Sequence, residues 1–503
     1  MLQQLPLHAF LDFAKTAKRV AIFREISASH LTPIGIVEQL TDEMLDGAIL
    51  ESGLNQDDAG RSSLIAFDSI AQLSVQANRV TQRIGTNVTT HVGHPFSILR
   101  ELIATLACVG QPHMMDFVSG AIGFFTYDAI RLFEAIPDRH ALDNPLPDML
   151  FNFYRTTLMF NHQRQTLLIS MVVDIDGDPH KQYHETQTQI DQLIKKIAGA
   201  SSQAMGTPGG PREAEARHGL DGTSVELDIN DEQFMQLILR AKEYIVAGDA
   251  FQVVLSRCFK KRYTVPPFAI YQALRRVSPS PYMFYLPFGD RVILGASPEK
   301  LISVRDGQVA INPIAGTRQR TATSNDQHIA DELLHDPKEQ AEHMMLVDLA
   351  RNDLGAVCKP GSINIQELLC VKHFSHVSHI TSVLTGQLRE DKDAFDAVAA
   401  AFPAGTLSGA PKIRAMQIID ELETSRRGMY GGAICRIDYQ GNLDSCIAIR
   451  MAVLEDGTAT VRTGAGIVYD SNPQSEANET RQKAQSLLDA IALAEESCHA
   501  ANY

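Results

Sequence analysis

The chain has 503 residues, which is room for several domains or for one large core with a smaller satellite. Hydrophobic residues make up 44% of it, so a large core is feasible, and the net charge is −15. An acidic chain is a poor partner for nucleic acid or for an anionic membrane surface, so we expect neither.

Targeting signals and disulfides are also not expected. No apolar run approaches the ~18 residues of a membrane-spanning helix, and the first six residues do not resemble a signal peptide. The seven cysteines are scattered and include no C-x-x-C pair. We therefore expect reduced thiols and a cytoplasmic protein.

The first 198 residues mix short helical and β-like patterns. The runs 63–67 and 71–77 are separated by Asp68 and Ser69, which predicts an antiparallel meander. The other expected elements are strands at 19–23, 47–53 and from 120, a helix at 98–106, a hairpin within 150–174 and a polar helix over 181–198.

A change of composition divides the chain. Residues 199–223 are small, polar and rich in Gly and Pro, which is typical of a linker. We therefore expect an N-terminal region over 1–198 and a second region over 224–503. No internal repeat or regular βαβ rhythm is present, which favours an antiparallel α+β architecture over a doubly wound sheet.

A helix is expected over residues 337–354, with Pro337 in its first turn. Its residues are apolar on most faces, so we expect it to be buried. Glu339, Glu342 and His343 nevertheless share one face. Because a buried carboxylate needs a partner, Glu342 is either a metal ligand or base, or one half of an ion pair with a basic residue such as Arg351.

Glycines mark two further segments. Residues 405–412 form a glycine-rich turn before a helix, where a ligand could approach the backbone or where the helix is simply capped. The strand at 461–468 is interrupted by Gly464 and Gly466, which indicates a close approach to a ligand or a β-bulge. Both alternatives stay open for each segment.

Charged residues in apolar or helical settings complete the candidates. Arg450 follows an apolar run, so its guanidinium needs a carboxylate from the protein or from a ligand. His379 lies among β-branched residues, either as hydrogen-bonded core or as an acid–base group. A helix opens at 472–473 and aligns Glu479 and Lys483 on one face, which is a solvated face or part of a site.

The order of these motifs resembles the chorismate-utilising enzymes and, among them, the large-subunit family of anthranilate synthase (component I). The matching stretches are 249–256, 280–283, 295–299, 313–318, 336–354, 376–379, 405–412, 430–432, Arg450, 464–466 and 476–483, with weaker matches at 50–52 and 123–128. The resemblance implies an α+β fold with two large antiparallel β-sheets packed face to face and surrounding helices.

The resemblance also implies a reaction. Ammonia adds to C2 of chorismate with loss of the 4-hydroxyl group, and elimination of pyruvate then gives anthranilate, the first step of tryptophan biosynthesis. Such chemistry needs a dication for the ring carboxylate, and Mg²⁺ prefers oxygen ligands. It also needs a general acid for the departing hydroxyl.

The resemblance assigns roles residue by residue. Glu342 and Glu479 are the expected Mg²⁺ ligands, and Glu299 is the expected general acid. His379 is expected to serve the pyruvate-releasing half, and Thr406 matches an active-site position. The expected substrate contacts are Gly316, Thr317, Tyr430, Arg450, Gly464, Ala465, Gly466 and Lys483.

Two positions separate the related activities. Water-using relatives carry a lysine base where this chain has Gln252, and an amide cannot deprotonate water. Aminodeoxychorismate synthases carry a nucleophilic lysine where this chain has Ala315. Direct addition of ammonia is what remains. The loop at 317–321 departs from the family pattern at Gln319 and Thr321. The rival hypotheses are an aminodeoxychorismate synthase and a non-catalytic, amino-acid-sensing subunit.

Regulation and a partner are further implications of the resemblance. A tryptophan feedback pocket is expected from Leu50, Glu51, Ser52, Pro281, Tyr282 and Met283. No cysteine lies in a glycine-flanked nucleophile turn. We therefore expect a separate glutamine amidotransferase small subunit (component II) to supply the ammonia.

Overall fold

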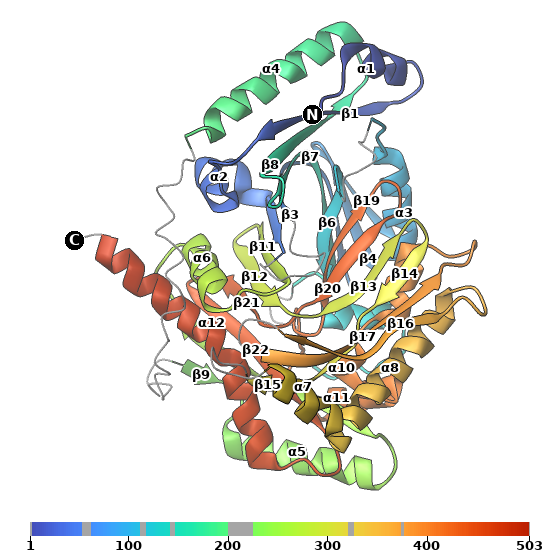
Figure 1. Ribbon diagram of the computed structural model, residues 1–503, viewed down its shortest axis with the longest axis vertical. Coiled ribbons are helices and arrows are strands. Elements are labelled where there is room, and N and C mark those ends of the chain that lie inside the picture. The colour runs from blue at the N-terminus through green and yellow to red at the C-terminus, as the bar shows by residue number, and fades with distance from the viewer. Residues whose placement is uncertain are drawn as a thin grey trace.

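The computed structural model describes residues 3–52, 62–110, 117–140, 146–199, 225–319, 326–373 and 377–501. The longer α-helices in these ranges mostly cover the outside of the sheet (Figure 1). The α-helices are α1 (Leu7–Ala14), α2 (Pro33–Gln39), α3 (Pro95–Leu106), α4 (Pro179–Ile197), α5 (Asp231–Val246), α6 (Pro267–Val277), α7 (Asp326–His335), α8 (Pro337–Val357), α9 (Ala394–Ala401), α10 (Gly405–Ser408), α11 (Lys412–Leu422) and α12 (Pro473–Ala501). Two short 3₁₀-helices are η1 (Glu43–Asp46) and η3 (Tyr127–Leu132).

The described strands are all antiparallel where they pair within the named elements, and they join in one hydrogen-bonded network. They are β1 (Arg19–Ser27), β2 (Ala48–Glu51), β3 (Ser62–Gln76), β4 (Arg79–Ile84), β5 (Asn87–Val92), β6 (Gly120–Phe125), β7 (Met149–Asn161), β8 (Thr166–Asp174), β9 (Val225–Leu227), β10 (Gln252–Arg262), β11 (Tyr282–Phe288), β12 (Arg291–Ser297), β13 (Lys300–Arg305), β14 (Gln308–Ile311), β15 (Ile314–Gln319), β16 (Asn364–His373), β17 (Val377–Gln387), β18 (Gly409–Ala410), β19 (Ala433–Asp438), β20 (Leu443–Ile447), β21 (Met451–Glu455) and β22 (Thr458–Ile467). The α+β fold class with large antiparallel sheets, expected from the sequence, is confirmed.

Two arms leave the long central pair β3 and β7. One arm continues from β3 through β2, β11, β12, β21 and β22 to β10. The other continues from β7 through β6, β19, β20, β13, β14 and β17 to β15 and β16. Strands that pass from one sheet into another commonly do so at a bulge. The two arms are branches of one large antiparallel sheet and are connected through β3 and β7.

The bulge lies in the middle of β3. The register against β7 shifts between Ser69 and Ala71, and Asp68 has a positive φ of 61°. The predicted meander of 63–67 and 71–77 is therefore wrong: both runs belong to one strand. They do not pair with each other because β7 pairs with both of them along its whole length.

The described residues form two large hydrophobic cores, and strands β6 and β19 contribute residues to both of them. One core includes the buried Ile293 of β12 and Leu487 of α12, and the other includes Val347 of α8 and Phe395 of α9. Helices α1 and α4 lie at one end of the molecule and α5 at the other (Figure 1). Helix α12 crosses the first arm over β22, and α8 covers β15 and β17 of the second.

Strands from before and after the predicted linker pair directly. Strand β2 pairs with β11, and β6 pairs with β19. The predicted linker at 199–223 falls almost wholly within 200–224, outside the described residues. The division into regions 1–198 and 224–503 therefore stays a prediction.

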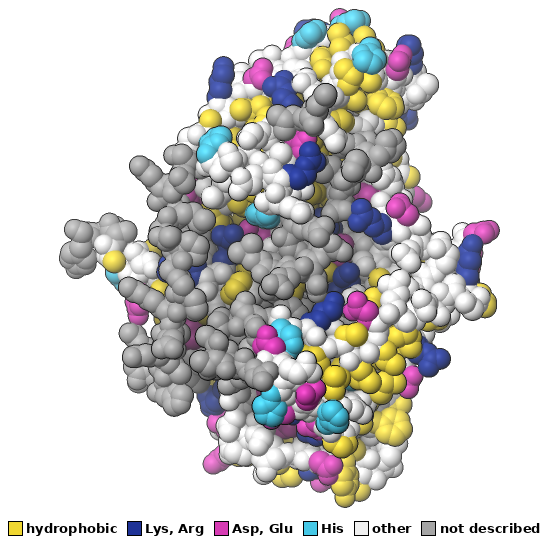
Figure 2. Space-filling model, viewed as in Figure 1, with side chains coloured by type: hydrophobic (Ala, Val, Ile, Leu, Met, Phe, Trp, Pro, Cys, Tyr) yellow, Lys and Arg dark blue, Asp and Glu magenta, His cyan; other side chains and the backbone are white. Residues whose placement is uncertain are grey.

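Charges of both signs are interspersed over the face shown in Figure 2. The seven cysteines are free thiols. Within the described part of the chain, no helix is both long and apolar enough to cross a bilayer.

Candidate active site

The paired strands β10 and β22 bring the predicted glycines together. Gly464 pairs with Ser256 and Gly466 with Val254, and the register continues without a shift along the whole pairing. The alternative of a β-bulge at these glycines is therefore wrong. A Cβ at Gly464 would lie 2.6 Å from the Tyr430 hydroxyl oxygen. A Cβ at Gly466 would lie 2.6 Å from Gln252 Nε2. The glycines are small because these two side chains occupy the space above the strand.

Gln252 and Tyr430 are both buried beside this strand, at 5% exposure each. The Oε1 atom of Gln252 is buried without a hydrogen-bond partner among the described residues. Burial raises the pKa of the Tyr430 hydroxyl, and so Tyr430 is a neutral hydrogen-bonding group at neutral pH. Ala465, between the two glycines, is fully buried.

Glu299 follows the end of strand β12 and meets the short helix α10. The Thr406 hydroxyl donates a hydrogen bond of 3.0 Å to Glu299 Oε1. Burial raises the pKa of Glu299 to about 7, although the Thr406 hydrogen bond and the charge of Lys483 act in the opposite direction. A carboxyl group with a pKa near neutrality can hold and release a proton, as a general acid must.

Lys483 of α12 connects the helix to the glycine strand. Its Nζ atom lies 3.0 Å from Gly464 O, to which it donates a hydrogen bond, and 2.5 Å from Glu479 Oε1. The predicted substrate-contact and metal residues on α12 are therefore adjacent. Helix α12 is capped by Asn472, which accepts hydrogen bonds from the backbone N–H groups of residues 474 and 475.

Helix α8 places Glu342 opposite α12. The helix begins after Asp336, whose side chain accepts hydrogen bonds from two backbone N–H groups of the first turn. It is buried on one face only: Met344 is 37% exposed, and Arg351 forms an exposed ion pair with Asp348. The helix that we expected to be buried is therefore buried on one face only, and Arg351 is not the partner of Glu342.

Negative charge converges between α8 and α12. Burial raises the pKa of Glu342, and the charges of Glu339 and Glu479 raise it further. Burial also raises the pKa of Glu476, which Glu479 again reinforces. Among the described residues no group of three or more His, Cys, Asp or Glu side chains is arranged to hold a metal ion. Two opposed carboxylates suit a cation such as Mg²⁺ that keeps several waters, and a dication would relieve their repulsion.

His379 lies on β17 of the other arm, opposite Thr317 of β15. Its Nδ1 donates a hydrogen bond of 2.8 Å to the Gly316 carbonyl oxygen, because a carbonyl can only accept. Burial lowers the pKa of His379, and Arg450 also lowers it, while the Gly316 hydrogen bond raises it. The imidazole is therefore neutral at neutral pH, with its unprotonated nitrogen at Nε2.

Gly316 lies at an irregularity in the β15–β17 register, and its φ of 64° is readily adopted only by glycine. A Cβ there would lie 3.1 Å from Glu339 Oε2. Glu339 itself pairs with Arg318 at 2.9 Å. The side chain of Thr317, like residue 321 of the departing loop, lies outside the described part of the structure.

Arg450 has the most unusual setting of the predicted residues. Its φ is 49°, a strained value for a non-glycine residue. Burial lowers the pKa of its guanidinium, which Tyr430 and Glu479 raise. Its backbone carbonyl accepts a hydrogen bond from the Ala296 N–H. Over the ranges that the structure describes, no hydrogen bond or ion pair involves its guanidinium. A carboxylate from a ligand could therefore pair with it.

The residues expected to bind tryptophan gather elsewhere, on the β2–β11 pair. Glu51 pairs in register with Met283, and Leu50 pairs with Phe284. Ser52 follows β2, and its N–H donates to Ser62 O. Pro281 immediately precedes β11, whose first residue is Tyr282. The six residues thus form one neighbourhood, distinct from the glycine strand.

Glu51 is buried and fully surrounded by donors. The Tyr271 hydroxyl donates at 2.7 Å, Arg275 Nη2 at 2.9 Å, and the Ser63 hydroxyl at 3.3 Å. The Tyr282 hydroxyl points instead to Asp444, at 3.3 Å.

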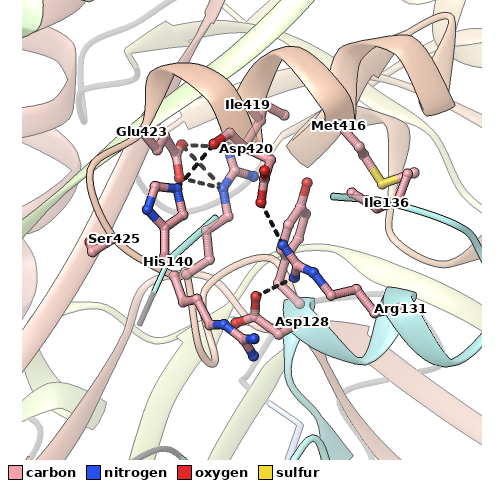
Figure 3. Close-up of a pocket in the computed structure, with 12 residues that line it drawn as sticks. Asp128, Arg131, Ile136, His140, Met416, Ile419, Asp420, Glu423 and Ser425 are labelled. Carbon is pink, nitrogen blue, oxygen red and sulfur yellow. Dashed lines mark hydrogen bonds and ion pairs between the residues drawn. The ribbon is translucent and has the colours of Figure 1, made fainter. Parts of the chain in front are cut away.

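The sequence reasoning missed a buried ion pair between Glu423 and Arg427. These residues stand four apart, but helix α11 ends at Leu422 and Glu423 has an extended backbone, so the pair lies beyond the helix and no helical spacing predicts it. Both also border the pocket shown in Figure 3, together with Asp128, Arg131 and Asp420. None of the predicted site residues lines that pocket.

Comparisons with known proteins identify the family of the chain. A family model described as chorismate binding enzyme matches residues 50–489. Anthranilate synthase component 1 of Bacillus caldotenax is 39% identical over 499 residues, covering 97% of each chain. That of Bacillus subtilis (strain 168) is 35% identical, covering 99% of this chain and 96% of the relative.

Solved structures are similar as well. Anthranilate synthase component I from Streptococcus pneumoniae TIGR4 superposes with a TM-score of 0.72 at 35% identity, covering 86% of this chain and 93% of that one. A menaquinone-specific isochorismate synthase from Escherichia coli superposes with a TM-score of 0.67 at 18% identity, covering 96% and 98%. The second likeness shows the fold alone.

Proposed function

The chain belongs to the chorismate-binding enzyme family, and from that premise we propose that it is the large subunit of an anthranilate synthase. It would convert chorismate and ammonia to anthranilate and pyruvate, the first step of tryptophan biosynthesis. The curated relatives that cover nearly its whole length carry that name.

The single observation that carries the proposal is Arg450. A half-buried guanidinium on a residue with a strained φ of 49°, without a hydrogen-bond or ion-pair partner among the described residues, suits a carboxylate of the substrate. Chorismate has two carboxylates. Arg450 would bind the enolpyruvyl carboxylate, together with the Tyr430 hydroxyl and the backbone of Gly464 and Gly466, with Ala465 between them.

The remaining residues divide the chemistry between the two arms. Glu299, with its pKa near 7, would donate a proton to the departing 4-hydroxyl group. On the other arm, neutral His379 would act in the pyruvate-releasing half, where an unprotonated nitrogen can accept a proton. Gly316 and Thr317 would contact the ring end of the substrate.

Glu342 and Glu479 would hold Mg²⁺. Their mutual repulsion and the raised pKa of Glu342 support this role. A bound Mg²⁺ would supply positive charge for the ring carboxylate. Because Glu479 is paired with Lys483 in this structure, Lys483 would turn toward the substrate when the cation is present.

The choice of ammonia over water rests on two side chains. Gln252 is buried beside Gly466 and cannot act as a base toward water. Ala315 of β15 cannot form the covalent adduct of an aminodeoxychorismate synthase. We propose that a glutamine amidotransferase subunit supplies the ammonia and that tryptophan inhibits at the pocket of Leu50, Glu51 and Ser52. The free thiols support a cytoplasmic location.

The test is anthranilate fluorescence from the purified chain with chorismate, ammonium and Mg²⁺ at alkaline pH. The expected result is a signal abolished by EDTA and restored by excess Mg²⁺. Glutamine in place of ammonium is expected to give little product from this chain alone. Chorismate consumed without anthranilate would indicate a sister activity. Chorismate left intact would indicate a regulatory subunit, and either outcome would overturn the proposal.

A further inference from the structure

Glu423 and Arg427 form the most deeply buried ion pair near the candidate site that the described residues show. Only 1% of the Arg427 side chain and 2% of the Glu423 side chain are exposed. Arg427 Nη2 lies 2.6 Å from Glu423 Oε1, and Arg427 Nε lies 3.0 Å from Glu423 Oε2. Figure 3 shows Glu423 on the wall of the pocket formed with Asp420 and Arg131.

The pair binds backbone atoms of two different elements. Arg427 Nη1 donates 2.6 Å to Leu407 O, and Nη2 donates 2.7 Å to Val254 O. Glu423 Oε1 accepts from both the N–H and the hydroxyl of Ser256, each at 2.8 Å. One ion pair therefore joins helix α10 to strand β10.

Each of these anchor points lies next to a predicted site residue. Val254 and Ser256 are the register partners of Gly466 and Gly464. Leu407 directly follows Thr406, the hydrogen-bond donor to Glu299.

Arg427 also holds an aromatic ring of the site. Its Cζ lies 5.7 Å from the centre of the Tyr430 ring and 4.5 Å from that of Tyr127, distances typical of cation–π contacts. The planar guanidinium can serve a carboxylate, two carbonyls and two rings at once, which a lysine ammonium cannot.

We infer that Glu423 and Arg427 are a positioning pair, which fixes the glycine strand, Thr406 and Tyr430 relative to one another. This inference rests on the proposed function, because those residues are the expected substrate-binding and acid-supporting groups. A buried ion pair is often no more stabilising than an apolar pair of the same volume. Its distinctive contribution is therefore geometry.

The test separates geometry from stability with a charge-neutral double variant, Glu423→Gln/Arg427→Met. Removing both charges leaves neither member of the pair charged and alone, and the neighbouring Arg462, which lies 3.6 Å from Glu423, keeps Asp228 at 3.5 Å as a partner. The variant is therefore expected to fold. Its kcat/KM for chorismate is expected to fall about 100-fold, because a misplacement of about 1 Å has that effect. Its KM for chorismate should rise, while the Mg²⁺ concentration for half-maximal activity should not change, since the pair contacts neither α8 nor α12.

The control is Glu455→Gln/Arg291→Met, which neutralises an ion pair of 2.7 Å between the buried Arg291 and the partly exposed Glu455, at the far end of β12. This control variant is expected to keep the kcat/KM and the KM for chorismate of the unmodified chain. The single variant Arg427→Lys keeps the charge and so the fold, but it cannot reach both carbonyls, and it should share the loss of kcat/KM. It also decides the question if the double variant does not fold.

Full kcat/KM in either folded variant would overturn the inference, as would a parallel shift in the Mg²⁺ requirement, which indicates general loosening. The unmodified chain is assayed beside them. If it makes no anthranilate, the proposed function fails. If it is active and the folded variants are equally active, only the positioning pair fails.

Discussion

Two carboxyl groups, the buried Glu51 and the partly buried Glu299, lie at the same end of the paired strands β2, β11 and β12 but have very different surroundings. Glu51 accepts hydrogen bonds from Tyr271, Arg275 and Ser63. Glu299 accepts one side-chain hydrogen bond, from Thr406, and burial raises its pKa to about 7. A saturated carboxylate holds its surroundings together, whereas an under-satisfied one is ready to exchange a proton.

The two arginines repeat the contrast. Arg275 is committed to Glu51, with Nε and Oε1 2.9 Å apart. The guanidinium of Arg450 has no such partner among the residues that the structure describes, and its backbone is strained. The comparison therefore predicts that substitutions around Glu51 and Arg275 (the first region) affect stability and regulation. Substitutions around Glu299 and Arg450 (the second region) should affect the chemical reaction.

The largest effect is expected from Glu299→Gln. The amide keeps the shape but cannot donate an acidic proton, so kcat should fall by about 10²–10⁴. Because the folded-state pKa is raised, the carboxyl favours the folded state at low pH and disfavours it above about pH 7, where it must ionise. The variant should therefore be at least as stable as the unmodified chain at pH 8, as measured by thermal unfolding. Loss of both activity and stability would mean that Glu299, like Glu51, has a structural role.

The same pKa predicts a pH dependence for the unmodified chain. A general acid must be protonated, so kcat should fall as the pH rises through about 7, the pKa of Glu299. The charge of Lys483, which faces Glu299, lowers that pKa. In the Glu299→Gln variant, the residual kcat should no longer fall as the pH rises through about 7. If the same fall persists in the variant, another group causes it.

A smaller effect on activity is expected from Arg450→Met. Loss of one partner of a charge-assisted pair costs about 2–5 kcal/mol, or roughly 30- to 5,000-fold in kcat/KM for chorismate. Thermal stability should not fall, since the substitution leaves no described side chain without its ion-pair or hydrogen-bond partner. A variant that melts earlier but binds chorismate normally would mean that Arg450 is structural.

The matched substitution in the other region, Arg275→Met, should do the reverse. It removes a donor from buried Glu51 and should lower the free energy of unfolding by about 1–3 kcal/mol. Tyr271 and Ser63 remain as donors, so the chain should still fold. Its kcat/KM should be unchanged at a temperature where it is folded. An equal loss of activity would show that the two regions are not separable.

Several helices and strands, and the residues of the candidate site, could be predicted from the sequence. The hairpin 150–174, the helix 181–198 and the cap at Asn472 depend on local signals, and the structure has them. Resemblance supplied the site residues, and the structure places Gln252, Tyr430, Gly464 and Gly466 side by side. Local patterns suffice where neighbours along the chain decide the outcome.

The features that the sequence did not predict depend on contacts with residues that are distant in the chain. Residues 62–76 form one strand only because β7 pairs with their whole length. Helix α8 is half-buried because a single face of it meets the second arm. The lack of an ion-pair or hydrogen-bond partner for the Arg450 guanidinium, over the described ranges, is likewise a property of the folded chain. No periodicity or spacing carries that information.

The smallest effect on turnover is expected from Ser52→Phe, which tests whether the first region is a tryptophan pocket. Ser52 follows Glu51 beside β11, and a larger ring there should obstruct a ligand at a cost of about 1–3 kcal/mol, or 5- to 150-fold in the inhibiting concentration. Turnover without tryptophan should barely change, because Ser52 contacts no predicted catalytic residue. Coupling between the regions has a direct route: Tyr282 pairs with Ser297, whose hydroxyl accepts from the Glu299 N–H at 3.3 Å. An unchanged inhibition curve would place the tryptophan pocket elsewhere.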